Sequence, residues 1–392
     1  MKLKLREANV QNFKRMALFL AGTALAITPY IAKAETIKIG VSQPLTGAVA
    51  ASGNYVVQGA KIAESFLNDS GGLLGKQVEL IIEDNKSNPK EAVATAEKLI
   101  VRDKVQVMMG AWSSTYTLAV MPKLMEYGIP MVVETSSSGK ITTSGNPWIF
   151  RISPTSAMEA KSFGTKVANF NVKKANFLVV NNDWGRGAAK EFQKMLKNKG
   201  ISIGVVETMD AKATDLSAQL AKIKSSGGNT LFVTSGVEQI TLVLKQAKEQ
   251  GLKQQIITTG GSSSPDQLIA QAGAAAEGSL HLLFFAPWFP EAAPNPKVAT
   301  KFVKEWKKRG HNFAGLTEGF RGHDGIMTIA AAIKAAGKNN AKAIQKALWG
   351  VKVKGVNGNI AFIKQGPAGK ESAQNIPNVY VVTIKDGKVA LP

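Results

Sequence analysis

The chain lacks cysteine altogether and contains only three histidines among its 392 residues. Without cysteine there is no disulfide bond, no thiolate zinc site and no cysteine nucleophile. The histidines, His281, His311 and His323, are too scattered along the sequence to form a local metal motif, and no H-E-x-x-H sequence is present. We therefore predict neither a metal ion nor a cofactor.

Sequence signatures of catalysis and of nucleotide binding are also missing. There is no G-x-S-x-G elbow, no G-x-x-x-x-G-K-[ST] phosphate loop and no G-x-G-x-x-G after a predicted strand. His323 and Asp324 form an adjacent acid–base pair, for which a surface position or a helix start is the simpler explanation. The sequence therefore predicts a protein that is not an enzyme.

Acidic residues are scarce relative to basic ones. The 28 Asp and Glu residues oppose 49 Lys and Arg residues, which gives a net charge of +21. On its own, this excess favours nucleic acid or an anionic surface as the partner. The remaining composition is ordinary, with 44% hydrophobic residues, and the length suits roughly two domains.

The first 34 residues have the three-part layout of a secretory signal peptide. Basic residues lie between Lys2 and Arg15, an apolar stretch runs from Met16 to Ile27, and small residues precede a cleavage point after Ala34. The apolar stretch is shorter than the ~20 residues that a membrane-spanning helix needs, so removal is favoured over anchoring. Cleavage removes six basic residues and one acidic residue, which lowers the net charge to +16. We predict a periplasmic protein with no nucleic-acid partner.

From residue 35 onward, short β-type runs alternate with longer helical patterns, as in parallel sheets covered by helices. The first series predicts strands near 37–41, 78–83, 105–109 and 130–133, with helices near 55–69, 89–103 and 115–127. The second predicts strands near 176–181, 201–207, 230–234, 255–259 and 280–285, with helices near 157–170, 186–199, 214–225, 239–250 and 264–272. A proline-rich connection at 286–296 precedes helices near 297–309, 317–336 and 340–349 and strands near 359–363 and 378–385. The predicted fold class is α/β, with two doubly wound parallel-sheet lobes.

Hydroxyl residues gather directly after two successive strands of the first series. Ser113 and Ser114 follow one strand, and Thr135, Ser136 and Ser137 follow the next. Such loops face one crevice of an open α/β sheet, where ligands usually bind. Backbone N–H groups at a helix N-terminus, joined by hydroxyls, suit a carboxylate or another small anion. The alternative is that these residues only cap helices and form turns, but their occurrence at successive strand ends favours a binding site.

Two tryptophans are further candidates for ligand contact. Trp184 lies in the turn-rich segment 181–187, after the first strand of the second series, which is a poor position for a core residue. From there it can cover a ligand held by the other lobe, and Trp112 lies beside the first hydroxyl loop. The alternative is that both tryptophans belong to the core.

A series of short motifs runs through the chain in a fixed order. The motifs are Ile37–Gly40 followed by Pro44–Gly47, Gly71–Lys76, Glu83–Asn85 with Asn88 and Pro89, the Ser113–Ser114 turn, and Asp183–Gly185. Together they resemble the periplasmic leucine/isoleucine/valine-binding proteins over nearly all of the mature chain, roughly residues 36–386. These proteins are the solute receptors of ABC importers of the branched-chain amino acid class, and they have a type I periplasmic binding fold.

The resemblance implies two lobes joined by a three-strand hinge, each lobe being discontinuous in sequence. The N-terminal lobe would comprise residues 35–152 plus 288–355, and the C-terminal lobe residues 153–287 plus 356–392. It also implies a receptor, expected to be monomeric, that closes on a small-molecule solute and delivers it to membrane permease subunits. Because the solute contacts both lobes only when they are shut, binding stabilises the closed form.

The resemblance also implies roles for individual residues. Ser114 falls where the family holds the ligand carboxylate with a hydroxyl and a backbone N–H group. Thr135 and Ser137 fall where a backbone carbonyl and a hydroxyl take the ammonium group, and Trp184 replaces a tyrosine lid.

Two positions depart from the family pattern. Gly260 stands where the family has the acidic partner of the ammonium group, and Ser52 stands where a tyrosine lines the side-chain pocket. A buried ammonium group needs an acidic partner, and Glu318 is the candidate substitute. Alternatively, the solute is a carboxylate without an α-amino group, such as an aromatic acid stacked on Trp184 and Trp112.

Several solutes and two other classes of protein are left as alternatives. Amino acids and aromatic-type carboxylates are the main candidate solutes, followed by amides or urea-like solutes. An exported serine hydrolase would need a base, but no His or Lys stands at a motif spacing from Ser113 or Ser136. A DNA-binding relative of the sugar repressors would need an N-terminal helix-turn-helix, where this chain has the predicted signal peptide.

Overall fold

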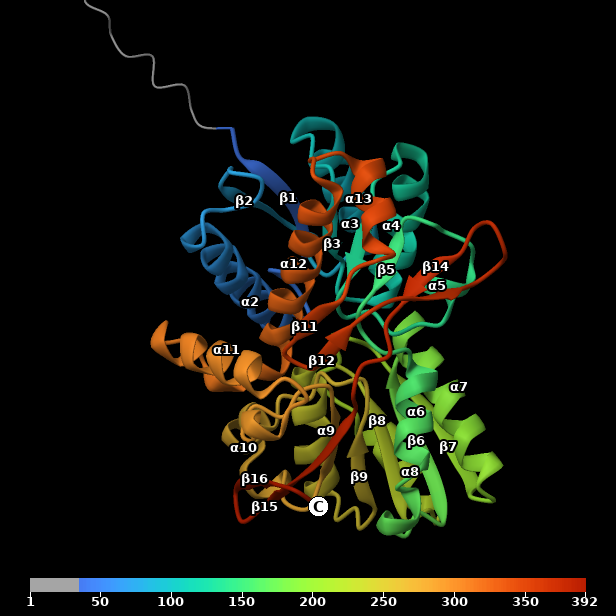
Figure 1. Cartoon of the computed structure of the whole chain (residues 1–392). Coiled ribbons are helices and arrows are strands. Elements are labelled where there is room, and N and C mark those ends of the chain that lie inside the picture. The colour runs from blue at the N-terminus through green and yellow to red at the C-terminus, as the bar shows by residue number, and fades with distance from the viewer. Residues whose placement is uncertain (1–34) are drawn as a thin grey trace, which may run out of the picture. The chain divides into compact units, whose positions relative to one another are not determined.

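The computed structural model describes residues 35–392, and the predicted signal peptide lies outside the described residues. Two seven-stranded sheets with helices packed against them form this part of the chain (Figure 1). The strand order is β13-β14-β5-β4-β3-β1-β2 in the first sheet and β16-β15-β10-β9-β8-β6-β7 in the second. We call each sheet with its helices a lobe. The predicted α/β class with two parallel-sheet lobes is confirmed.

The first sheet is parallel except at one edge, where β13 pairs antiparallel with β14. Its strands are β1 (Ile37–Gln43), β2 (Val78–Asp84), β3 (Met108–Gly110), β4 (Met131–Val133), β5 (Ile149–Arg151), β13 (Ile363–Gln365) and β14 (Ser372–Gln374). The α-helices in the sequence between these strands are α2 (Ala50–Asp69), α3 (Pro89–Glu97), α4 (Ser114–Tyr127), α5 (Lys140–Thr143), α11 (Pro296–Lys308), α12 (Leu316–Ala336) and α13 (Ala341–Leu348). A hairpin of β11 (Val353–Gly355) and β12 (Gly358–Ile360) follows α13.

The second sheet is parallel in its centre and ends in the antiparallel strands β15 and β16. Its strands are β6 (Lys174–Val180), β7 (Ser202–Met209), β8 (Thr230–Thr234), β9 (Gln255–Thr258), β10 (Leu280–Leu283), β15 (Tyr380–Lys385) and β16 (Lys388–Ala390). Helix α6 (Ser156–Gly164) precedes β6, and the α-helices between β6 and β10 are α7 (Asp183–Asn198), α8 (Ser217–Ser225), α9 (Val237–Glu249) and α10 (Pro265–Ala272). Each predicted strand and helix overlaps an observed one, whereas β5, β11, β14, β16 and α5, each three or four residues long, were not predicted.

The last part of the chain corrects the predicted division into lobes. The prediction assigned residues 356–392 to the second lobe, but β13 and β14 belong to the first sheet, where β14 pairs in parallel with β5. Only β15 and β16 join the second sheet. The chain therefore crosses between the sheets after β5, after β10 and after β14, so the third crossing lies beyond residue 374 and not near 356. Strands of three residues are too short to show an alternation that would reveal their partner.

Capping residues explain where several of these helices begin. The side chain of Asn88 accepts hydrogen bonds from the first backbone N–H groups of α3, and Pro89 occupies the first helical position, as predicted. Asn182 caps α7 in the same way. Within residues 35–392, no helix is both long enough and apolar enough to span a bilayer.

Helices α2 and α12 approach each other backbone to backbone. A Cβ atom at Gly59 of α2 would lie 1.7 Å from the carbonyl oxygen of Gly319, and one at Gly322 of α12 would lie 1.9 Å from that of Val56. Only glycine fits at such distances, so Gly59 and Gly322 determine how closely α12 packs against α2. This matters for the site because α12 carries the buried charged residues described below.

We predict that Gly59→Ala destabilises the protein by about 1–3 kcal/mol or more, because the added methyl group meets backbone that cannot move aside. Urea unfolding of the mature chain measures the effect. Gly187→Ala in α7 is the matched control, since nothing lies within 4 Å of its added Cβ; there alanine should be neutral or stabilising. Equal effects of the two substitutions would contradict the role assigned to the α2–α12 contact.

Candidate functional site

A small cavity lies between the two lobes. The hydroxyl loops after β3 and β4 form its wall on the first lobe, and the start of α7 and the loop after β9 form its wall on the second. Its lining residues are Trp112, Ser113, Ser114, Thr135, Ser136, Ser137, Trp184, Gly260 and Ser262. We call it the tryptophan cavity. It brings together seven of the nine predicted site residues.

The hydroxyl groups of these loops have different partners. Ser136 Oγ donates to the carbonyl oxygen of Trp112 at 2.8 Å and so ties the two loops together. Ser114 Oγ accepts a hydrogen bond from the backbone N–H of Ser138 at 3.1 Å. Ser113 is the N-cap residue of α4, yet its buried hydroxyl has no hydrogen-bond partner among the residues that the structure describes. Ser113 can therefore offer a hydrogen bond to a ligand at the N-terminus of α4.

The two tryptophans contact each other, one from each lobe. Their ring centroids are 5.8 Å apart and their planes are inclined at 80°, an edge-to-face arrangement. Trp184 also covers Gly260, where φ is +88° and a Cβ atom would lie 2.4 Å from Cζ2 of the Trp184 ring. The ring of Trp184 therefore occupies the space that an acidic side chain at position 260 would need.

An acid from another element lies beside Gly260. Glu159 of α6 is fully buried and accepts a hydrogen bond from the Gly260 backbone N–H at 2.6 Å. Glu159 was not among the site residues predicted from the sequence. The available signal was an acidic residue on the helix face that also carries Ala160 and Phe163, a face that is buried.

Glu318, the predicted substitute acid, is also buried next to the tryptophan cavity. Its Oε2 lies 3.2 Å from Nε of Arg321 on the same helix, α12. Ser262 and Trp112, which line the cavity, are polar neighbours of its carboxyl group. Two acids, Glu159 and Glu318, are thus close to the position where the family pattern has one.

Ser52 does not join this group. Helix α2 begins at Ala50 and not near residue 55 as predicted, which places Ser52 in the first turn of the helix. There it is buried, and it is not among the residues that line the tryptophan cavity. The predicted role of Ser52 in the solute pocket therefore has no support in the geometry.

Three carboxyl groups and one guanidinium are buried where α12 meets the second lobe. Glu134, Glu159, Glu318 and Arg321 are each at most 1% exposed. Burial raises the pKa of all three acids, that of Glu159 to about 8, while the charge of Arg321 acts in the opposite direction. Because the acids outnumber the guanidinium, the cluster is stable only when protons or the N–H groups of a ligand accompany it.

The cluster still has unused hydrogen-bonding capacity. Oε2 of Glu134, Oε2 of Glu159 and both carboxylate oxygens of Glu318 form no hydrogen bond of good geometry with any residue in 35–392. A buried carboxylate without donors is costly, so these oxygens point to a ligand that supplies N–H or O–H groups.

Two polar contacts join the lobes beside the cavity. Arg321 donates from one terminal nitrogen to the carbonyl oxygen of Gly261, in the loop after β9, at 2.6 Å. The backbone N–H of Asp183 donates to Thr115 Oγ1 at 3.2 Å, and that hydroxyl lies 3.2 Å from a carboxylate oxygen of Asp183. These contacts link the two lobes in the arrangement that this structure has.

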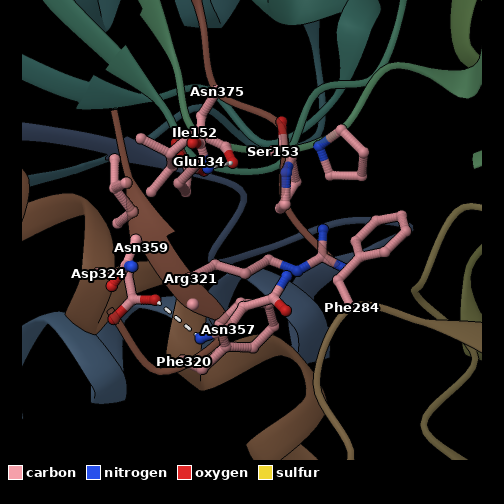
Figure 2. Close-up of a pocket in the computed structure, with 14 residues that line it drawn as sticks. Glu134, Ile152, Ser153, Phe284, Phe320, Arg321, Asp324, Asn357, Asn359 and Asn375 are labelled. Carbon is pink, nitrogen blue, oxygen red and sulfur yellow. Dashed lines mark hydrogen bonds between the residues drawn. The ribbon is translucent and has the colours of Figure 1, made fainter. Parts of the chain in front are cut away.

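A second, narrow cavity lies at the crossing segments (Figure 2). All three crossings line it, through Ile152, Ser153, Pro154, Phe284, Asn375 and Pro377. Glu134 and three residues of α12, Phe320, Arg321 and Asp324, complete its wall together with residues 357–360 of the β11–β12 hairpin. We call it the hinge cavity. Arg321 links it to the tryptophan cavity, because its Nε faces Glu318.

The histidines do not form a catalytic arrangement. His281 is buried in β10 with both ring nitrogens near hydroxyl groups, and burial lowers its pKa to about 3. The ring of His323 contacts Asp324 at 3.0 Å. No group of three or more His, Asp or Glu residues in the described part of the chain is arranged to hold a metal ion.

Comparison with known proteins identifies the family. A model described as periplasmic binding protein matches residues 36–388, which is most of the chain. The chain belongs to the periplasmic binding protein family. Proteins of this family are periplasmic solute-binding receptors and not enzymes. The resemblance to the leucine/isoleucine/valine-binding class is confirmed.

Individual relatives of this periplasmic binding protein have different solutes in their names. A leucine-, isoleucine-, valine-, threonine- and alanine-binding protein of Pseudomonas aeruginosa is 28% identical over 355 residues, covering 90% of this chain and 93% of that one. A leucine-binding protein of Thermotoga maritima matches with a TM-score of 0.80 at 27% identity, covering 91% and 98% of the two chains. An ABC-transporter solute-binding protein of Rhodopseudomonas palustris in complex with 3,4-dihydroxybenzoic acid matches with a TM-score of 0.78 at 25% identity, covering 90% and 95%.

The raised pKa of Glu159 predicts a pH dependence of stability. In the unfolded chain this carboxyl titrates near its ordinary value of 4.5, and in the folded chain near 8. Its contribution to stability is therefore fully present below about pH 4.5 and is lost as the pH rises towards 8. We expect the melting temperature of the ligand-free periplasmic binding protein to fall over this range.

Glu159→Gln tests this assignment, because glutamine has a similar shape and stays neutral at every pH. The variant should lose part of the downward slope of melting temperature against pH. Glu249→Gln, at an exposed position of α9, is the control and should reproduce the wild-type slope. A Glu159→Gln profile parallel to that of the wild type would refute the assignment.

Proposed function

We propose that this protein is the solute receptor of an ABC importer and that it closes on a small solute carrying both a carboxylate and an ammonium group. The observation that carries the proposal is the pairing of a free hydroxyl at a helix N-terminus with two buried, incompletely bonded acids beside one cavity. An amino acid carries a carboxylate that complements the helix N-terminus and an ammonium group that complements the two acids.

The carboxylate end of the solute would lie at the N-terminus of α4. The N–H groups of the first helical turn lack helical partners, and the positive end of the helix dipole favours an anion. The hydroxyl groups of Ser113 and Ser114 line the cavity at this point. The resemblance assigned the carboxylate to Ser114, and the free hydroxyl of Ser113 adds a second donor.

The ammonium end would lie towards Glu159 and Glu318. Both acids are buried within reach of residues that line the cavity, Glu159 through Gly260 and Glu318 through Ser262. An ammonium group supplies three N–H donors and a positive charge, which offsets the excess of acids over guanidinium in the cluster. Thr135 and Ser137 are available as the neutral partners that the resemblance assigns.

An aromatic carboxylate is the second candidate solute. It is favoured by the two tryptophans, whose rings offer aromatic contact, and by the relative that binds 3,4-dihydroxybenzoic acid. Phenolic hydroxyls could donate to the buried acids in place of an ammonium group. The edge-to-face contact between Trp112 and Trp184 leaves less room for a ring between them than parallel rings would, so an amino acid is our first proposal.

The remaining predictions complete the proposed function. Export through the signal peptide, with cleavage after Ala34, would deliver a monomeric receptor to the periplasm, where the closed form would dock on permease subunits. We propose lobe boundaries at the three crossings described above. The N-terminal lobe would comprise residues 35–152, 288–374 and the C-terminal lobe residues 153–287, 375–392.

Solute identity is tested by native mass spectrometry of the freshly purified mature protein, followed by titration calorimetry with amino acids, aromatic acids and amides. We expect an amino acid to bind and to raise the melting temperature by mass action. Binding of benzoate-type acids without binding of any amino acid would favour the second candidate. No binding by any carboxylate would refute the proposal.

Two substitutions test separately the contact proposed for the carboxylate end of the solute and the one proposed for its ammonium end. Ser113→Ala should weaken both amino acids and aromatic acids about tenfold, because each loses one hydrogen bond to its carboxylate. Glu159→Gln should weaken amino acids about 10- to 100-fold and aromatic acids much less. Ser225→Ala, an exposed position on α8, is the control. Equal effects of Glu159→Gln on both solute classes would argue against an ammonium group at this acid.

A further inference from the structure

The hinge cavity has a specific set of unused hydrogen-bonding atoms. Of the side chains that line it, three retain buried atoms without a hydrogen-bond partner in the described part of the chain: Oε2 of Glu134, Oδ1 of Asn357, and two nitrogens of Arg321, of which Nε faces Glu318 and the other is a terminal nitrogen. Figure 2 shows these three side chains around the same space. The cavity therefore offers two acceptors and one donor.

Neighbouring contacts fix the orientation of these atoms. Gln43 donates to the other oxygen of Glu134 at 2.8 Å, which leaves Oε2 as the free acceptor. The amide nitrogen of Asn357 donates to the carbonyl oxygen of Asn378 at 3.2 Å, so its Oδ1 is the free atom. Arg321 is held by its bond to the second lobe and by the rings of phenylalanines 284 and 320, with its guanidinium 5.2 and 5.8 Å from their centroids.

A primary carboxamide has donors and an acceptor of the kinds that complement this set. Its NH₂ group supplies two N–H donors, for Glu134 and Asn357, and its carbonyl oxygen accepts from Arg321. A ureido group offers the same atoms. Apolar residues, among them Ile152, Pro154 and Ile360, line the rest of the cavity.

Charged groups match the cavity less well. Two acids, Glu134 and Asp324, line it against one guanidinium, which also lies beside the acid Glu318, so a carboxylate would add a negative charge to an acidic site. An ammonium group would leave the free donor of Arg321 without an acceptor and would be repelled by its charge. A neutral group with both donors and an acceptor avoids both costs.

We propose that the hinge cavity is a binding site for a primary carboxamide or ureido group. This goes beyond the proposed function, which assigns no occupant to the hinge cavity. The group has two possible sources, the far end of the solute itself or a separate small amide. In either case the occupant contacts all three crossing segments, so its binding favours the arrangement of the lobes seen in this structure.

Three probes of nearly equal size test the proposal on the mature protein: propionamide, propionate and propylammonium. Saturation-transfer NMR detects weak binding, and competition gives relative affinities. We expect propionamide to bind at least tenfold more tightly than either charged probe. Equal binding of the three probes, or no binding of propionamide, would overturn the proposal, because the cavity would then hold water only.

Variants locate the bound amide. Glu134→Gln and Asn357→Leu each remove one proposed acceptor and should each weaken propionamide about tenfold. Ser113→Ala in the tryptophan cavity should leave it unchanged. Thermal melting establishes that each variant is folded. Asn357→Leu, in the turn between β11 and β12, tests the site where Glu134→Gln fails to fold. An equal loss of propionamide affinity in Ser113→Ala would indicate that the amide binds in the tryptophan cavity and would overturn the proposal.

A final comparison distinguishes the two sources of the amide. Glutamine carries amino acid groups and a terminal carboxamide on one molecule. If the amide is the far end of the solute, one glutamine per protein chain displaces propionamide. Glutamine then also binds more tightly than glutamate. If the amide is a separate molecule, propionamide binds in the presence of saturating amino acid. Either result supports the carboxamide site, while displacement of propionamide by glutamate and glutamine alike contradicts it.

Discussion

The guanidinium group of Arg321 is the charge on which the arrangement of the two lobes depends. It lies in the first lobe on α12, donates to the carbonyl oxygen of Gly261 in the second, and is the positive charge that acts on the buried acids Glu134, Glu159 and Glu318. Removing one member of a buried charged group usually costs more than the group contributes, because the remaining charges are left uncompensated. The hinge cavity borders this side chain, and its neighbour Glu318 lies beside residues that line the tryptophan cavity, so the position of Arg321 affects the chemistry of both.

The position of Arg321 depends in turn on uncharged packing. Gly59 and Gly322 allow α2 and α12 to approach until backbone meets backbone, which sets the depth at which α12 enters the interface. On the second lobe, the missing side chain at Gly260 allows the ring of Trp184 to lie over the backbone and Glu159 to bond its N–H group. The close approaches that these glycines allow therefore determine where the charged side chains of Arg321 and Glu159 lie.

The sequence predicted the fold class, the long helices and strands and the hydroxyl loops, because each leaves a local pattern of periodicity or composition. It also identified Glu318, through its place in the family pattern. It missed Glu159, whose acidic side chain interrupts an otherwise buried helix face and meets Gly260 only through a contact 101 residues away in sequence. It did not predict β14 and assigned its residues to the second lobe, since a three-residue strand has no pattern that reveals its partner β5. Contacts between distant segments were the missing information in each case.

The excess of acids over guanidinium explains how a solute could control closure. When the lobes are apart, water solvates these side chains, and their charges cost little. When the lobes close without a solute, three carboxyl groups lose that water and gain only one guanidinium, so each must take up a proton or remain poorly bonded. A solute that supplies N–H donors and positive charge removes this cost only in the closed form. Closure is then favoured by the solute through the free energy of desolvation, and the difference in its affinity for the two forms sets the extent of the shift.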